Sequence, residues 1–388
     1  MHKILFYGNL CNLGYNFAKA VNDAGRSDLY AEFLISSQDM EMMNPSNPIW
    51  EDEEIRFHLP EWILVSREKK LRRRGPLRTV FSLIFNYRNC RMQFSKKDIV
   101  FSSTLMNIWA MLCAKKYVAM TTGSDIVELA HQKSILGKIY LNSLKKASCI
   151  GLLNTNHIDH AKQLGLDNYR FIPFAIDTAK YKPDKNKPRS DKIIILHSSA
   201  LDWVESDIRP DNVKKNDIFF KGFAKFIKTV EQEIANRINV IVLEFGKDIL
   251  ETKELILQLG INDKIIYLPK CSKSELIDKY CKADIVVDQF AVGAFGLNAL
   301  EAMAGGSIVL TYLEENNALE CYGDLPPILN CRTEEDVCNA LARIASNSFS
   351  ELADMKKKAQ DWVIKHHDYR NVVPIISDII KRTLPINH

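Results

Sequence analysis

Residues 283–310 constrain the fold of this chain more than any other stretch. The segment reads ADIVVDQFAVGAFGLNALEAMAGGSIVL, in which a β-branched apolar run ends at Asp288 and a glycine-bearing loop, 293–296, follows. Apolar residues at helical spacing then begin at Leu297 and stop at the glycine pair 305–306, before a second apolar run. This order predicts a buried parallel strand, a loop, a short helix and the next strand.

A loop that joins a strand to a helix in this way forms a site for an anion. The first N–H groups of a helix have no partner within the helix, and the helix dipole favours negative charge there, so phosphate suits the position. Glu301 lies about one turn into the predicted helix, near enough to bind hydroxyls beside that phosphate. A phosphate next to a diol indicates a nucleotide. The alternative is that Glu301 is a helix-face carboxylate and Gly296 an ordinary turn residue.

Length and composition predict a two-domain soluble enzyme. The chain has 388 residues, with 46% hydrophobic and 26% charged residues, which is ordinary for globular proteins. No apolar run is long enough to span a membrane, and the N-terminus does not resemble a signal peptide. Nine scattered cysteines without a CxxC pair indicate free thiols in a reducing compartment. We therefore expect a cytoplasmic protein.

Charge and patterning divide the chain into two halves. Residues 1–190 carry 28 Lys and Arg against 18 Asp and Glu, whereas 191–388 carry 24 against 30. A polar, proline-bounded linker marks the break. We predict one domain over 1–182, a second domain over 191–360, and a C-terminal segment over 361–388.

Strands and helices are expected to alternate in both halves. Alternation of this kind is typical of the α/β class, with doubly wound, Rossmann-like parallel sheets that face each other across a cleft. The predicted strands are 3–7, 99–102, 118–121, 147–153 and 169–172 in the first half, and 192–197, 238–244, 264–267, 285–288 and 307–312 in the second. Helices are predicted at 15–24, 219–235 and 273–281, with two more over 350–382.

The second half resembles the donor-binding domain of GT-B glycosyltransferases, in particular the retaining family 4, or group 1, enzymes. The resemblance covers roughly 171–368 and is most specific in 295–306. Further matching pieces are LEFGKD, which contains Gly246, and YLP, which ends at Pro269. The resemblance implies the GT-B fold and use of a nucleotide diphosphate sugar, UDP- or GDP-linked, as co-substrate, with no other cofactor. It also implies that 1–182 is the acceptor-binding domain, that 191–360 is the nucleotide-sugar-binding domain, and that a helix over 361–388 crosses back to the first domain.

The resemblance also implies roles for individual residues. Glu301 would hold the ribose hydroxyls, and the N–H groups of Gly296, Leu297 and Asn298 would cap the diphosphate. The loop residues Gly293, Ala294 and Phe295 would lie along the sugar, and Gly246 and Pro269 would complete the donor site.

Two departures from the family pattern concern catalysis. The family's usual glutamate eight residues before Glu301 is replaced by Gly293, so the Glu-x7-Glu motif is degenerate. The family's usual arginine after the first strand of the domain is absent, and its expected position falls near Ala200. The accompanying lysine matches Lys214, or less well Lys215, and Arg209 is a candidate to replace the missing arginine. A cation is required for the departing diphosphate, and without an Asp-x-Asp motif we predict metal independence.

The first half offers two candidate loops. Asn12 and Gly14 lie in the loop after the first strand and are candidates for the phosphate or acceptor. Asp125, in a TTGSD segment that resembles a His-Gly-Ser-Asp sequence of related transferases, either acts in catalysis or caps the following helix. His157 and His160 have no third metal ligand nearby, and we expect surface or capping roles for them.

A basic cluster leads into an apolar helical stripe over residues 67–87. This pattern is typical of segments that bind anionic lipid surfaces, and it equally fits a helix packed on the domain with a solvated basic edge. Aromatic residues are not interleaved with the basic ones, so nucleic-acid binding is not expected.

Together these patterns predict a retaining, metal-independent hexosyltransferase. The predicted acceptor is a glycan or lipid-linked glycan in cell-surface polysaccharide synthesis, with the enzyme in the cytoplasm or at the inner face of the membrane. Two alternatives stay open: a nucleotide-sugar epimerase on the same fold, and a nucleotide-sugar-binding protein without turnover.

Overall fold

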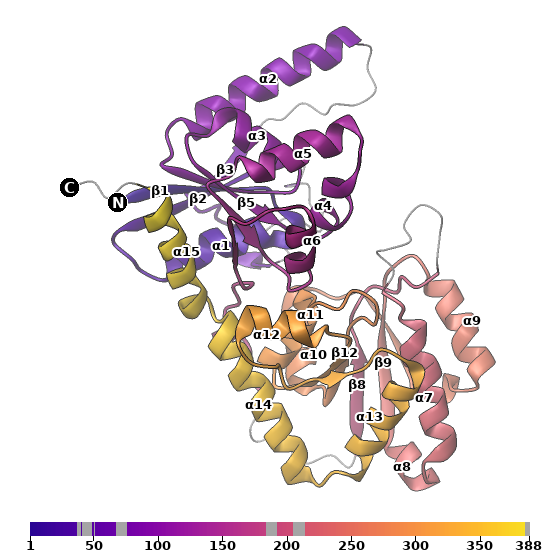
Figure 1. Ribbon diagram of the computed structural model, residues 1–388. Coiled ribbons are helices and arrows are strands. Elements are labelled where there is room, and N and C mark those ends of the chain that lie inside the picture. The colour runs from indigo at the N-terminus through magenta and orange to yellow at the C-terminus, as the bar shows by residue number, and fades with distance from the viewer. Residues whose placement is uncertain are drawn as a thin grey trace. The chain divides into compact units, whose positions relative to one another are not determined.

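A computed structural model of the chain describes residues 1–36, 40, 49, 51–66, 76–183, 192–204 and 214–384; the side chains of 76–83 and 349 are not described. The chain forms two compact units, shown in Figure 1. The first consists of Met1–Ile176 and His367–His388, and the second of Asp177–His366. The predicted basic cluster 67–75 lies outside the described residues.

The first unit is built on a parallel sheet of seven strands. Their order is β3 (Ile63–Ser66), β2 (Leu29–Ser36), β1 (His2–Tyr7), β4 (Ile99–Ser103), β5 (Tyr117–Thr121), β6 (Cys149–Leu152) and β7 (Tyr169–Phe171). All five strands predicted for this half are present, and β2 and β3 were not predicted. The order reverses between β1 and β4, which is the doubly wound arrangement.

Helices cover both faces of this sheet. They are α1 (Leu13–Asp23), α2 (Pro76–Phe94), α3 (Met106–Cys113), α4 (Ser124–Val127), α5 (Ile135–Lys145), α6 (His157–Gln163) and α15 (Tyr369–Thr383). Figure 1 shows α2, α3 and α5 on one face and α1 and α15 on the other. The helix α2 begins within the predicted stripe 67–87, at Pro76, a residue type that suits the first turn of a helix.

The C-terminal helix is tied to the first unit by its own start. Ile176 donates its N–H to the carbonyl of His367 at 2.8 Å, and Tyr369 donates to the carbonyl of Ile176 at 3.0 Å. Asp368 then caps α15 by accepting the N–H of Arg370 at 3.0 Å. The chain therefore returns from the second unit to the first at His367, and α15 packs against α1.

The second unit has a parallel sheet of six strands. Their order is β10 (Ile265–Pro269), β9 (Ile238–Glu244), β8 (Ile193–His197), β11 (Ile285–Val287), β12 (Ile308–Thr311) and β13 (Leu329–Asn330). The five strands predicted for this half are present, and only the two-residue β13 was not predicted. The strand order reverses between β8 and β11.

Helices again lie on both faces. They are α7 (Asp217–Thr229), α8 (Gln232–Arg237), α9 (Ile249–Leu259), α10 (Lys273–Lys282), α11 (Leu297–Ala304), α12 (Glu315–Tyr322), α13 (Glu334–Ser346) and α14 (Phe349–His367). The prediction of one helix over 219–235 was wrong, because Val230 and Glu231 adopt extended backbone and separate α7 from α8. The β-branched pair Thr229 and Val230 disfavours helix continuation there.

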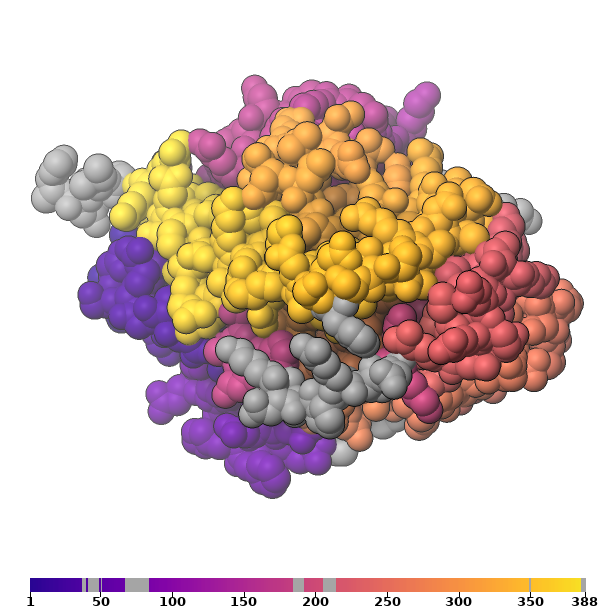
Figure 2. Space-filling model, turned by 90° about the horizontal axis from the view of Figure 1, so that it is seen from below, coloured from indigo at the N-terminus to yellow at the C-terminus, as the bar shows by residue number. Residues whose placement is uncertain are grey.

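The core of the second unit lies between the sheet and α7 with α13. Four phenylalanines of α7 are completely buried against β-branched strand residues: Phe219, Phe220, Phe223 and Phe226. On the opposite face, α10 and α11 bury Tyr280, Leu300 and Met303. Figure 2 shows α14, near the yellow end of the colour bar, at the surface. Helices thus bury both faces of the sheet, and the loops at the ends of its strands can position side chains.

Candidate functional site

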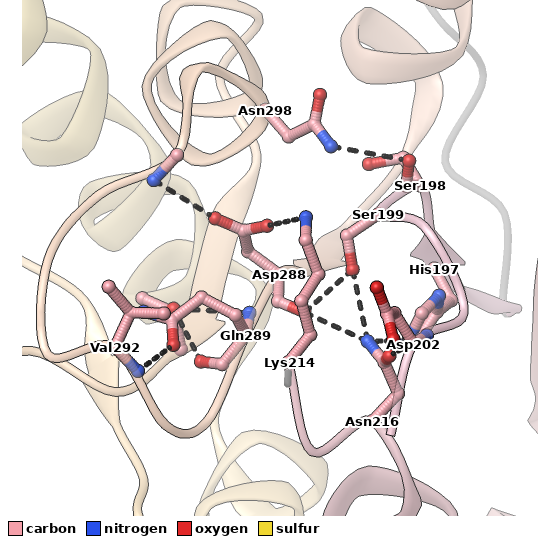
Figure 3. A network of polar contacts seen from close by, with 12 residues as sticks. His197, Ser198, Ser199, Asp202, Lys214, Asn216, Asp288, Gln289, Val292 and Asn298 are labelled. Atoms are coloured by element: carbon pink, nitrogen blue, oxygen red, sulfur yellow. Dashed lines mark hydrogen bonds and ion pairs between the residues drawn. The ribbon is translucent and has the colours of Figure 1, made fainter. Parts of the chain in front are cut away.

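The candidate site lies at the carboxyl ends of β8 and β11. These strands are neighbours at the point where the strand order reverses, and ligands of open α/β sheets bind at such a point. The loop after β8 carries Lys214, and the loop after β11 leads to α11. Figure 3 shows side chains from both loops meeting there.

Asp288 links these two loops. One carboxylate oxygen, Oδ2, accepts the N–H of Gly296 at 3.3 Å, and the other, Oδ1, lies 3.9 Å from Nζ of Lys214 (Figure 3). The side chain of Asp288 is 1% exposed, whereas that of Lys214 is 31% exposed. The ammonium group is therefore held at the start of α11 and still has access to solvent.

The backbone of Lys214 is held on both sides. Its N–H donates to the carbonyl of Asp202 at 2.7 Å, and its carbonyl accepts the N–H of Phe290 at 2.9 Å. The second bond joins the β8–α7 loop directly to the β11–α11 loop. Position 214 is consequently tied to the carboxyl ends of both central strands.

A buried polar network lies under the β8–α7 loop. Asn216 donates through Nδ2 to Oγ of Ser199 and Nε2 of His197, both at 3.2 Å, and accepts the N–H of Asp202 at 2.9 Å. Ser199 donates to the carbonyl of Asp288 at 2.8 Å. Complete burial, with the nearby charge of Lys214, lowers the pKa of His197 to about 3, so the ring is neutral and can accept from Asn216.

The N-terminus of α11 offers unused donors. Gly296 is the cap residue, and in the part of the chain that the structure describes the N–H groups of Leu297 and Asn298 have no hydrogen-bond partner. The side chain of Asn298 donates to the carbonyl of Ser198 at 3.3 Å, which links α11 to β8. A Cβ at position 296 would come within 2.8 Å of Oδ2 of Asp288, so the close approach requires glycine.

The side chains of the glycine loop, which were expected to lie along the sugar, are buried where they exist. Gly293 has φ +69°, a conformation that disfavours a side chain, so glutamate would be strained at this position. The Ala294 side chain is buried, and the carbonyl of Ala294 accepts Nε2 of Gln289 at 2.8 Å. Phe295 is also buried and packs on Trp362, with ring centroids 5.9 Å apart. The two side chains hold the loop in place, and only its backbone remains for a ligand.

Glu301 lies on α11 and is buried in the second unit. Its carboxylate forms an ion pair with the ammonium of Lys273, the first residue of α10. The predicted ribose-binding carboxylate is thus held by a cation from the neighbouring helix.

The remaining predicted donor-site residues lie at the same edge of the sheet or outside the description. Gly246 has φ +123°, and a Cβ there would come within 2.2 Å of the Leu201 carbonyl, which explains the glycine. Pro269 ends β10 and is exposed. Arg209 lies outside the described residues.

The first-unit candidates are occupied by local structure. Asn12 is buried, and its Oδ1 accepts Nδ2 of Asn9 at 2.9 Å. Gly14 lies in the first turn of α1, where a Cβ would be 2.4 Å from the Gly8 carbonyl. The loop is therefore shorter than predicted, and both residues serve the turn from β1 into α1.

Asp125 is buried at the start of α4. Oδ1 accepts N–H groups from Thr122 and Gly123 at 2.9 Å and from Ile126 at 3.0 Å. Oδ2 accepts the hydroxyl of Tyr140 at 2.9 Å. Burial raises the pKa of Asp125, and these hydrogen bonds oppose the rise. The carboxylate therefore holds the loop before α4 and the first turn of this helix, whose cap residue is Gly123.

The two histidines of α6 differ from each other. His157 is completely buried, with Nδ1 2.9 Å from Oγ1 of Thr121, so the surface role expected for it was wrong. Burial lowers its pKa to about 3. Nδ1 of His160 lies 3.1 Å from Nε2 of His131 at the surface. Within the described ranges, no group of three or more His, Cys, Asp or Glu could hold a metal ion.

Comparison with known proteins identifies the second half. Residues 215–362 match the family model of the glycosyl transferases group 1. These residues are therefore similar to a group 1 glycosyltransferase domain. The domain contains Asp288, the glycine loop and α11, and Lys214 immediately precedes it. The predicted glycosyltransferase class is confirmed.

Whole-chain similarity shows the GT-B fold. The chain is 14% identical to Anabaena Alr3699/HepE, solved in complex with UDP and glucose, with 97% of this chain and 99% of that chain covered and a TM-score of 0.67. Sucrose-phosphate synthase (tll1590) from Thermosynechococcus elongatus is 12% identical, with 98% and 99% covered and a TM-score of 0.69. The predicted fold class is confirmed.

A curated relative matches over a shorter stretch. The chain is 25% identical over 164 residues to the D-inositol 3-phosphate glycosyltransferase of Nocardia farcinica (strain IFM 10152). The match covers 40% of this chain and 36% of that enzyme, so it spans only about a third of the enzyme's length.

Sequence reasoning missed three residues of the candidate site. Asp288 was taken only as the end of a strand, although a carboxylate that ends an apolar strand before a glycine loop is itself a signal. Asn216, next but one to Lys214, is the cap of α7 and the centre of the buried network. Lys273 follows a serine cap and carries no distinguishing pattern, so its contact with Glu301 required the fold.

Proposed function

We propose that the chain is a retaining, metal-independent hexosyltransferase that uses a UDP- or GDP-linked sugar. The observation that carries the proposal is the convergence of the Lys214 ammonium with the N-terminal N–H groups of α11 at the switch point of the second sheet. The likeness to a structure solved with UDP and glucose supports this donor class. The acceptor that we propose is a glycan or lipid-linked glycan in cell-surface polysaccharide synthesis.

The site can stabilise a departing diphosphate. When the bond between the sugar's anomeric carbon and the β-phosphate oxygen breaks, negative charge builds on the diphosphate. The ammonium of Lys214 and the N–H groups of Leu297 and Asn298 are suited to stabilise that charge. In a front-face reaction the acceptor hydroxyl attacks from the side of the leaving group, gives its proton to the departing phosphate oxygen, and retains the anomeric configuration.

Nucleotide binding and turnover test this proposal in order. Thermal unfolding is measured with UDP, GDP and ADP, since a ligand at 100 times its dissociation constant stabilises by about 2.7 kcal/mol. Release of nucleoside diphosphate from the matching sugar donor is then measured with a glycan acceptor, with and without EDTA. Lys214→Ala should slow release about a hundredfold with little change in nucleoside binding. The control is Lys215→Ala, which removes an exposed neighbour. Equal effects of the two changes contradict the proposal.

One observation favours binding without turnover as a second candidate. Gly293 stands where related enzymes carry a glutamate, and its positive φ disfavours that replacement. Tight nucleotide-sugar binding with no transfer and no hydrolysis supports this candidate, and release of a free epimerised sugar without acceptor indicates an epimerase instead.

We also propose peripheral contact of the first unit with the inner face of the membrane. No helix in the described part of the chain is long and apolar enough to cross a bilayer. Large apolar side chains are nevertheless exposed on α2 and α5, both of which pack against α3: Ile84, Phe85, Met92, Ile135, Leu136 and Ile139. Arg88, Arg91 and Lys138 are exposed on the same helices. Exposed apolar and basic residues together suit an anionic lipid surface.

Vesicle co-sedimentation tests the membrane proposal. The protein should sediment with phosphatidylglycerol vesicles and much less with phosphatidylcholine vesicles. Replacing Ile135 and Ile139 by serine should weaken sedimentation, whereas Leu257→Ser, at an exposed position of the second unit, should not. Equal sedimentation of all variants excludes this surface.

A further inference from the structure

A buried carboxylate lies next to the proposed diphosphate site. Asp288 is completely buried, and among the described residues its Oδ1 has no hydrogen-bond donor. The nearest compensating charge is the ammonium of Lys214, 3.9 Å away. Burying an ionised carboxylate without compensation is strongly unfavourable, so this contact is what allows the charge at position 288.

The same contact restricts Lys214. Hydrogen bonds to Asp202 and Phe290 hold its backbone, which leaves the four-carbon side chain as the mobile part. A lysine side chain has many rotamers, and a nearby negative charge selects those that place the ammonium close to it. Because Oδ2 of Asp288 also accepts the N–H of Gly296, the selected position lies at the N-terminus of α11.

The contact leaves the ammonium able to bind a second anion. A separation of 3.9 Å is longer than the 2.7–2.9 Å of a direct charge-assisted hydrogen bond. The lysine side chain is 31% exposed and the aspartate side chain 1%. An ammonium group has three N–H donors, so it can keep its attraction to Asp288 and donate toward solvent.

We propose that Asp288 is the positioning residue of Lys214: its buried carboxylate holds the ammonium in the place where negative charge develops on the departing diphosphate. The inference rests on the proposed function, in which Lys214 stabilises that charge. Asp288 does not touch the substrate, and it acts through the lysine.

The proposal gives two effects of opposite sign. Asp288 places a negative charge near the site, so neutralising it should strengthen the binding of an anion in the ground state. It also restricts the cation, so neutralising it should slow the step in which the diphosphate departs. A general structural defect would weaken binding and turnover together.

The test combines Asp288→Asn with Lys214→Gln. Pyrophosphate affinity is measured by calorimetry and kcat by release of nucleoside diphosphate. Asp288→Asn should bind pyrophosphate about tenfold more tightly and lower kcat about tenfold. In the Lys214→Gln background, the same change should lower kcat by less than about twofold, whereas the gain in pyrophosphate affinity should remain, because it comes from the charge of Asp288 itself. Glu244→Gln is the control, because it removes an equal charge from a 29% exposed side chain at the end of β9 and should change both quantities little.

Three results overturn the proposal: additive effects on kcat, weaker pyrophosphate binding by Asp288→Asn, or an equal gain in binding with Glu244→Gln. If Asp288→Asn does not fold, the double variant Asp288→Leu with Lys214→Met is used instead. It removes both charges and so leaves no uncompensated charge in the buried site. Its kcat should equal that of Lys214→Met, and a lower value overturns the proposal. If the wild type binds nucleotides without turnover, the proposed function fails, and the pyrophosphate measurements still decide the role of Asp288.

Discussion

Glu301 and Lys273 form an ion pair between α11 and α10, with side chains only 6% and 16% exposed. Removing one partner of a buried pair leaves an uncompensated charge, which is more harmful than removing both partners. The residue predicted to bind ribose is therefore also part of the packing between two helices.

Lys273→Met should destabilise the protein by about 3 kcal/mol, because it leaves the carboxylate of Glu301 in a buried place without this cation. Urea unfolding measures the change. Lys282→Met is the matched control, because Lys282 and Asp278 form an ion pair in which the two side chains are 61% and 57% exposed. Loss of this exposed pair should change the free energy of unfolding by less than about 1 kcal/mol. Equal effects of the two changes would show that burial of the Lys273 pair is unimportant.

Glu301→Ala should weaken the binding of UDP or GDP about tenfold, since a hydrogen bond to a charged group contributes about 1.5–3 kcal/mol. Calorimetry with the nucleoside diphosphate measures the effect. The affinity of the variant for the nucleoside without phosphates should fall to a similar degree. Glu254→Ala, at an exposed position of α9, serves as the control. Unchanged affinity in the folded variant removes Glu301 from the donor site.

Phe295→Ala should destabilise the second unit by about 3 kcal/mol, because it leaves a cavity against Trp362. Val292→Ala in the same loop, where the side chain is 37% exposed, should cost less than about 1 kcal/mol. Urea unfolding compares the two. A small effect of Phe295→Ala would show that the ring does not hold the loop.

Stability should fall as pH decreases below about 6.5. Burial lowers the pKa values of His157 and His197 to about 3, so between pH 6.5 and 3 the unfolded chain binds more protons than the folded one. Each histidine then contributes a loss of about 1.4 kcal/mol per pH unit within that range.

Urea unfolding from pH 7 to pH 5 measures this dependence. His157→Gln should reduce the slope of the unfolding free energy against pH by the contribution of one histidine. His131→Gln, at the surface, is the control. An unchanged slope in His157→Gln would mean that the buried ring does not account for the acid sensitivity.

Local pattern was sufficient for most of the second sheet. The strands β8, β11 and β12 are almost entirely apolar runs, and β9 carries polar residues only near its ends, at Asn239 and Glu244, which is how strands buried on both faces appear in a sequence. In the first unit β2 was missed because Glu32 interrupts its apolar pattern. The structure places Lys97 against that carboxylate as an ion pair, which only the folded chain can provide.

The sequence by itself determined the alternating α/β architecture, the strand–loop–helix unit from β11 to α11 and the glycosyltransferase class, because each depends on residues close together in the chain. Only the tertiary structure decided that Lys214 meets Asp288, that Lys273 meets Glu301, and that Phe295 turns inward to Trp362. These pairs come from segments distant in the chain, and strand order and helix packing bring them together. A buried ion pair leaves no local pattern in the sequence, because its stability depends on which neighbouring residues exclude water from it.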